Sequence, residues 1–282
     1  MKTPSRDILY RVIFVFFVCL LAVVPAMDAW ATFISPKRVM IEDKQRSARL
    51  TIHNGTDQTL VYRFEWEHRA QVAGGNVLLM KEGETVAGYR PAESMLRFSP
   101  RQVILKPNEH QRIRFLVQRP ADMAEGEYHS HFLIKSEPME EATPAPPPVV
   151  NPKTGIIGSL KVRTNASIPV FLRHGKTQVD FTLNSARLIQ EDGLYYVRVQ
   201  LNNNSTRSLY IKPELVCGSG DNATSTIIRT IKLYTEGKSV NDDIPVPKAF
   251  DLSGCSSLQL KLSGTDDFEH KRKVITQIDV AR

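Results

Sequence analysis

Short segments in which apolar and polar residues alternate at a period of two dominate this sequence, and they restrict its fold more than any other feature. In Ala48–Asn54 (ARLTIHN) every second residue up to Ile52 is apolar, and Asn54-Gly55 then predicts a turn. No sustained 3.6-residue period occurs after the first 31 residues, so no helix longer than a turn or two is expected. The pattern predicts an all-β protein.

Similar segments recur in both halves of the chain, which suggests two domains for 282 residues. They are Leu60–Glu67, Arg101–Leu105, Gln111–Val117, Glu127–Ile134, Val179–Leu188, Tyr195–Asn202, Tyr210–Val216, Ile227–Leu233, Leu258–Leu262 and Lys273–Val280. Strands this short and this regularly spaced are typical of immunoglobulin-like sandwiches. We expect a first β-sandwich over residues 32–173 and a second, smaller one over residues 174–282.

Residues 1–31 have the pattern of a cleaved signal peptide. Three basic residues precede the apolar run Val12–Val24, and Ala29-Trp30-Ala31 has the small residues that precede a cleavage site. Thirteen apolar residues are too few to cross a hydrocarbon layer about 30 Å thick, which argues against a membrane anchor. We therefore expect an exported protein that begins near Thr32.

Two cysteines, Cys217 and Cys255, remain after the signal peptide. An even number of cysteines in an exported chain favours a disulfide. A redox pair or a metal site is the alternative, but neither cysteine has a C-x-x-C neighbour or a nearby histidine in the sequence. We predict a structural disulfide within the second sandwich.

Neither charge nor motifs point to nucleic acid or catalysis. The formal net charge is +7, and the basic residues are spread along the sequence rather than gathered in one block, so nucleic acid is not expected as a partner. No nucleotide, hydrolase or zinc-protease motif occurs, so neither an enzyme nor a cofactor is expected. Glu127, His129 and His131 alternate on one strand face and could bind zinc, but three such residues are a weak signal, and we favour surface or edge histidines without a metal.

One segment differs from all others. Residues 138–152 contain six prolines and are predicted to form a loop. Directly after them, Ile156–Leu172 is a long segment whose even-numbered positions are mostly apolar, as in Ile156, Leu160 and Val162. A strand of this length could offer an apolar row and an unpaired edge to another chain, including a second copy of itself.

The stretch from Phe98 to Pro138 resembles the periplasmic chaperones of the chaperone/usher pathway of pilus assembly. Its F-S-P-R-Q-V-I-L-K-P-N-E-H-Q-R-I-R-F segment is followed by G-E-Y-H-S-H-F-L-I-K-S-E-P. Ile34-Ser35-Pro36-Lys37-Arg38-Val39 also resembles the first strand of that family. The likeness covers residues 32 to about 173 well and the second domain only in general character.

The resemblance implies a two-domain periplasmic chaperone that caps pilus or fimbrial subunits with a donated strand. A subunit lacks the last strand of its sandwich, and the chaperone fills the groove by β-augmentation before the subunit passes to an outer-membrane usher. The donated row would be Leu160 and Val162, with Ile156 and Thr164. The implied partners are therefore fimbrial subunits and the usher.

The resemblance also implies site residues between the two domains. Arg38 would anchor the carboxylate at the end of the subunit. The family pairs this arginine with a lysine, but Pro169 stands at that position, so Lys161 or Arg163 would complete the anchor, or the carboxylate chemistry differs. Glu127 and Arg173, with Asp266 or Asp267 as a third partner, would form ion pairs that fix the angle between domains.

Two other functions are compatible with an exported β-sandwich protein. An adhesion or ligand-binding module would use the same fold without assisting another protein. A secreted enzyme is the weaker alternative because no catalytic group of residues is visible.

Overall fold

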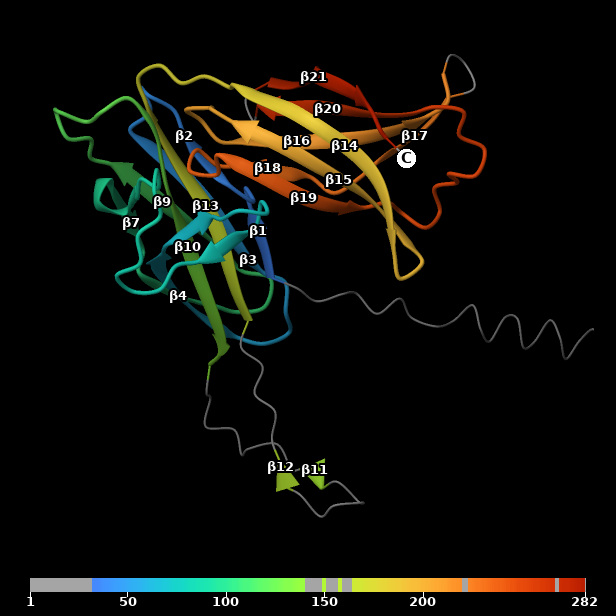
Figure 1. The fold of residues 1–282 in the computed structure, drawn as a ribbon. Helices are drawn as coiled ribbons and strands as arrows, with labels where there is room; N and C mark the ends of the chain where they lie inside the picture. The colour runs from blue at the N-terminus through green and yellow to red at the C-terminus, as the bar shows by residue number, and fades with distance from the viewer. Residues whose placement is uncertain are drawn as a thin grey trace, which may run out of the picture.

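A computed structural model describes residues 32–139, 149–150, 157–158, 164–219, 223–266 and 269–281 (Figure 1). Residues 1–31, the expected signal peptide, and the residues Ile156, Leu160 and Val162 lie outside these ranges. The expected all-β fold is confirmed, since the helical structure in the described residues is one 3₁₀ turn, Glu93–Met95. In the same ranges, no helix has the length and apolar character that would let it span a membrane.

The first sandwich consists of two sheets that enclose one apolar core. The first sheet has the strand order β1 (Thr32–Ser35), β3 (Ser47–Asn54), β9 (His110–Val117), β7 (Leu96–Ser99). The second has the order β2 (Val39–Ile41), β13 (Thr164–His174), β10 (Gly126–Pro138), β4 (Leu60–Glu67), β8 (Gln102–Leu105). The alternation described above determines which side chains enter the core, where Phe115 and Phe132 pack edge to face.

The second sandwich has a core of its own. One sheet has the order β14 (Phe181–Glu191), β15 (Leu194–Asn203), β19 (Ser239–Pro245). The other has the order β17 (Thr224–Ile227), β16 (Leu209–Cys217), β20 (Leu258–Asp266), β21 (Glu269–Asp279), and β18 (Ile231–Leu233) also pairs with β16. The predicted disulfide between Cys217 and Cys255 is present.

Two predicted segments differ in detail. The expected strand Ile227–Leu233 is two strands, because β17 ends at Ile227 and β18 begins at Ile231. Pro138, assigned to the loop, is the last residue of β10. Pro138 pairs with Leu60 of β4 on one side. On the other side, β13 pairs with β10 only as far as Ser136, so no described strand lies next to the proline there. The missing N–H of Pro138 therefore costs no hydrogen bond to a strand on that side.

The long segment Ile156–Leu172 is described only in part. Its second half forms β13, whereas β12 (Ile157–Gly158) pairs with β11 (Val149–Val150) in a separate hairpin. A further hairpin that the sequence did not indicate consists of β5 (Arg69–Gln71) and β6 (Val77–Leu79). It reaches the second sandwich through Gln71.

Candidate functional site

Strand β13 has a strand neighbour along its whole length on only one side. β10 pairs with it from Thr164 to His174. On the opposite side β2 pairs only with Val170–Leu172. Among the described residues, no strand covers that side of Thr164–Pro169. Backbone groups along an uncovered edge can pair with a strand from another chain.

The even-numbered residues of β13 face the core of the first sandwich. Ile168 and Val170 are buried in it, Ala166 packs against it, and Thr164 is exposed. A pocket of about 500 Å³ opens next to Thr164 and Ala166, and Ile34 of β1 and Ile134 of β10 also line it. The even-numbered residues of β13 therefore lie in the core at Ile168 and Val170 and beside the pocket at Thr164 and Ala166.

Arg38 lies at the interface between the two sandwiches. It immediately precedes β2, whose Val39 pairs with Val170 of β13. The guanidinium carbon of Arg38 lies 4.1 Å from the centre of the Tyr210 ring, which belongs to β16 of the second sandwich. This is a cation–π arrangement. Arg38 is thus beside the strand whose edge is uncovered.

Pro169 is opposite His131 of β10 in the strand register. The two bases named as alternative partners of Arg38, Lys161 and Arg163, lie outside the described residues. Thr164 is the one member of the expected donated row that the structure describes.

Glu127 and Arg173 are brought together in a buried ion pair. Arg173 Nε donates to Glu127 Oε2 at 2.8 Å, and Arg173 Nη1 donates to Glu42 Oε1 at 2.6 Å. Burial alone would lower the pKa of Arg173, but the two carboxylates together raise it. The backbone N–H of Ser208, in the second sandwich, donates to Glu127 Oε1 at 2.8 Å, so the ion pair extends across the interface.

The third member of this network is Glu42, which the sequence did not indicate. Asp266, the expected third partner, is the last residue of β20, and its backbone pairs with Glu269. Its side chain and the whole of Asp267 lie outside the described residues.

The interpretation of His129 and His131 as surface or edge histidines is wrong. Both residues are buried, with exposed fractions of 0% for His129 and 4% for His131. His129 Nε2 lies 3.2 Å from both carboxylate oxygens of Glu236, a buried residue of the second sandwich. Burial, reinforced by His129, Arg69 and Lys232, lowers the pKa of His131 to about 3. The histidines are at the interface because the face of β10 that they share meets the second sandwich.

Gln71, at the end of β5, joins the hairpin of β5 and β6 to the second sandwich. Its side-chain Nε2 donates to Lys232 O at 2.6 Å, and its Oε1 accepts from the Tyr234 N–H at 2.8 Å. Its backbone N–H donates to Glu236 Oε1 at 2.8 Å. We name residues 69–79 the strap hairpin. No local pattern in the sequence marks Gln71, because its partners are more than 160 residues away.

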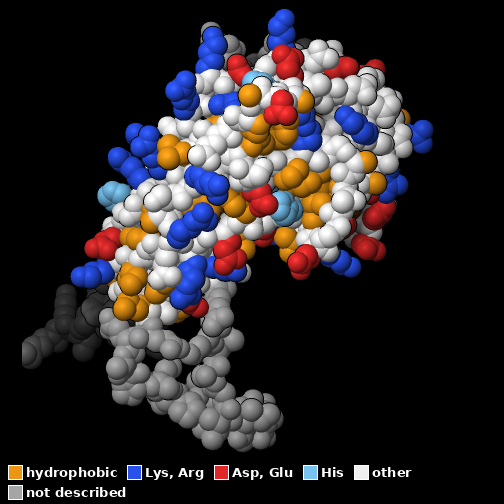
Figure 2. Space-filling model, turned by 90° about the vertical axis from the view of Figure 1, so that its left-hand side faces the viewer, with side chains coloured by type: hydrophobic (Ala, Val, Ile, Leu, Met, Phe, Trp, Pro, Cys, Tyr) orange, Lys and Arg blue, Asp and Glu red, His pale blue; other side chains and the backbone are white. Residues whose placement is uncertain are grey.

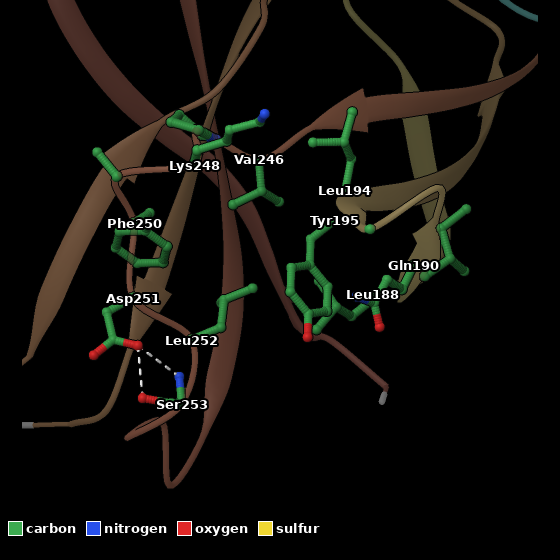
Figure 3. Close-up of a pocket in the computed structure, with 14 residues that line it drawn as sticks. Leu188, Gln190, Leu194, Tyr195, Val246, Lys248, Phe250, Asp251, Leu252 and Ser253 are labelled. Carbon is green, nitrogen blue, oxygen red and sulfur yellow. Dashed lines mark hydrogen bonds between the residues drawn. The ribbon is translucent and has the colours of Figure 1, made fainter.

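A second pocket, of about 750 Å³, lies in the second sandwich (Figure 3). The turn between β14 and β15 forms one wall and residues 246–253 form the other. Tyr195 and Leu188 lie opposite Phe250 and Leu252 in the close-up. The Ser253 N–H and hydroxyl both donate to Asp251 Oδ1, which fixes the loop. This pocket contains none of the site residues expected from the sequence.

In the parts of the chain that the structure describes, no three His, Cys, Asp or Glu residues are grouped so that they could hold a metal ion. Lys and Arg side chains gather along the left-hand margin of the molecule in Figure 2, whereas acidic and basic side chains are mixed elsewhere in that view.

Comparison with known proteins gives structural neighbours only. No protein-family model matches the sequence, and no curated protein does either. The fold is similar to the YadV chaperone, with 11% identity, a TM-score of 0.48, and coverage of 88% of this chain and 98% of that one. It is also similar to the Pseudomonas aeruginosa CupB2 chaperone, with 12% identity, a TM-score of 0.43, and coverage of 89% and 100%.

A third similar structure is that of the Salmonella enterica SafB chaperone in complex with the SafA pilin. The identity is 10%, the TM-score is 0.47, and the coverage is 91% of this chain and 99% of the other. The neighbours are pilus chaperones, the family that the Phe98–Pro138 stretch resembles.

Proposed function

We propose that this protein is a periplasmic chaperone that binds pilus or fimbrial subunits, caps them with a donated strand, and delivers them to an outer-membrane usher. The observation that carries the proposal is the edge of β13 over Thr164–Pro169, which no described strand covers. Main-chain hydrogen bonds along such an edge give affinity, and alternating side chains give fit. The donated residues would be Ile156, Leu160, Val162 and Thr164, which continue the even-numbered set of β13.

Arg38 would receive the carboxylate of the bound subunit. Arg38 precedes Val39, which pairs with Val170 of β13, so it lies where the uncovered edge Thr164–Pro169 ends. The Tyr210 ring contacts one face of its guanidinium in a cation–π arrangement. A guanidinium recognises a carboxylate through charge-assisted hydrogen bonds, so Arg38 would set the register in which a subunit strand pairs with β13.

The buried ion pair of Glu127 and Arg173 would hold the two domains at a fixed angle around this anchor. We take the domains to be residues 32–173 and 174–282, after a signal peptide of residues 1–31 that directs the chain to the periplasm. The role is one of binding, and we assign no catalytic residue and no cofactor.

The test is a pull-down of the tagged protein from the periplasm of its own host, with mass spectrometry and native mass measurement of the eluate. The variants are Leu160→Asp and, as a matched control, Leu78→Asp, since Leu78 is 53% exposed on the strap hairpin. We expect the wild type and the control to elute as 1:1 complexes with a small exported β-protein. Leu160→Asp should fold but elute alone, because a carboxylate in an apolar groove loses its hydration.

Retention of the complex by Leu160→Asp would remove the donated-strand mechanism. Elution of the wild type alone or as a self-dimer, while candidate subunits are expressed, would contradict the chaperone function itself.

A second candidate function, that of an adhesion or ligand-binding module, is favoured by one observation. The pocket between Tyr195 and Phe250 is large and partly apolar, as small-molecule sites are (Figure 3). Substitution Tyr195→Ala would then abolish ligand binding and leave any subunit complex unchanged.

A further inference from the structure

The outer face of the first sheet collects arginines that are far apart in the sequence. The outward positions of β3, β9 and β7 are the exposed ones in each alternating strand. Four of them are arginines, namely Arg49, Arg97, Arg112 and Arg114. No acidic residue occupies an outward position of these strands or of β1. We name the four residues the arginine face.

The strand register places these side chains next to one another. Arg49 is directly opposite Arg114, and Arg97 is opposite Leu116 on the same strand as Arg114. Arg112 is two residues from Arg114, a spacing of about 7 Å along a strand. Like charges directly opposite each other destabilise a sheet. In the described part of the chain, none of the four arginines forms an ion pair.

The outer face of the other sheet of this sandwich is arranged differently. There Arg63 pairs with Glu137, and Lys135 pairs with Glu65. Each base on that face has an acid beside it, as is usual on a solvated sheet. Of the two outer faces of this sandwich, the arginine face is therefore the one with unbalanced charge, which indicates an anionic partner.

Apolar side chains lie among these charges. Phe33 of β1 is 60% exposed, and Leu116 of β9 is 44% exposed. Phe33 is opposite His53 and Leu116 is opposite Ser47, so both point outward from the same sheet. A sheet surface that combines several arginines with isolated exposed Phe and Leu side chains offers the same groups that bind membrane surfaces elsewhere, namely basic groups for anionic lipids and apolar groups for the headgroup layer.

We propose that the arginine face binds the phosphate headgroups of an anionic lipid membrane, with Phe33 and Leu116 entering the headgroup layer. Charge complementarity supports this occupant, since a lipid surface offers phosphates at many positions to four neighbouring arginines. A second copy of this face is excluded as the occupant because it would repel the first. The inference goes beyond the proposed function and does not depend on it, because no residue of β13 takes part.

The test is flotation of the mature protein with vesicles of phosphatidylglycerol and phosphatidylethanolamine, compared with vesicles of phosphatidylcholine alone. The test variant is Arg112→Ser/Arg114→Ser. The control, Arg187→Ser/Lys176→Ser, removes the same charge from two exposed residues outside the arginine face. Each basic residue near an anionic surface strengthens binding about fivefold, so we expect the test variant to bind about 30-fold more weakly and the control to bind like the wild type.

Binding of the wild type should also weaken as salt rises from about 0.1 M to about 1 M, since the Debye length falls from about 10 Å to about 3 Å. Circular dichroism of both variants verifies folding, which removal of opposed like charges should not impair. Equal weakening of test variant and control, or equal binding to neutral vesicles, would overturn the proposal. Binding to poly-glutamate without binding to vesicles would also overturn it and would point to an acidic protein.

Discussion

His131 is a histidine that the fold holds in its neutral form. Burial lowers its pKa to about 3, and the positive groups Arg69 and Lys232 add to the effect. Above pH 6.5, the pKa of an unfolded histidine, both states are neutral and the residue has no effect on stability. Between that pH and about 3 only the unfolded chain binds the proton, so the free energy of unfolding falls by about 1.4 kcal/mol per pH unit.

Substitution His131→Phe should therefore make the protein less sensitive to acid. The His131 ring packs near Tyr234, and its Nδ1 has no hydrogen-bond partner in the described residues, so a phenyl ring loses little there. Between about pH 7 and about pH 4.5 we expect the variant to lose about 2–3 kcal/mol less stability than the wild type. Urea unfolding at both pH values measures the difference. His110→Phe, at an exposed histidine, is the control, and an equal effect of both substitutions would contradict the buried neutral state.

At the scale of elements, the strap hairpin is held to the second sandwich by the side chain of Gln71. A Cβ atom added at Gly237 would lie 2.1 Å from Gln71 Oε1. Gly237→Ala should thus expel the Gln71 side chain and leave the buried N–H of Tyr234 without its acceptor, at a cost of about 1–3 kcal/mol. Hydrogen exchange should rise in residues 69–79.

Gly254→Ala is the matched control, because an added Cβ there meets no atom within 4 Å. It should change the free energy of unfolding by less than about 1 kcal/mol. If the exchange of the hairpin is the same in both variants, Gln71 does not hold the hairpin to the second sandwich.

Most strands could be predicted because alternation is a local property of the chain. β4 was predicted with its observed ends, Leu60–Glu67, and β3 and β9 within one residue at their first ends. The strap hairpin was missed because its two strands, although close in sequence, have only three residues each, too few to show alternation. Its contacts with the second sandwich were missed because those partners are distant in sequence. The arginine face was missed for the same reason: the charge is spread along the chain, and only the register of β3, β7 and β9 gathers it. The alternation of His129 and His131 showed their shared face but not that the second sandwich covers it.

At the scale of the whole molecule, the interface couples the two sandwiches through buried polar contacts. Glu127 accepts from the Ser208 N–H, His129 contacts Glu236, and Gln71 bonds to Tyr234. Separation of the sandwiches would exchange these contacts for hydrogen bonds to water, at a net cost of about 0.5–1.5 kcal/mol for each. We therefore expect one cooperative unfolding transition for both sandwiches rather than two.

Removal of the disulfide tests this coupling. The disulfide lies in the second sandwich, whereas Trp66, whose fluorescence reports unfolding, lies in the first. Cys217 and Cys255 are 38 residues apart in the second sandwich, and opening a loop of that size should lower the free energy of unfolding by about 4 kcal/mol. The sequence has two tryptophans, and in protein prepared without residues 1–31 the remaining one is Trp66, which packs against the core of the first sandwich. In the double variant Cys217→Ala/Cys255→Ala, the urea midpoint followed by Trp66 fluorescence should fall together with that followed by circular dichroism. A Trp66 midpoint equal to that of the wild type would mean that the sandwiches unfold independently, and the interface could not then hold the fixed angle that we assign to it.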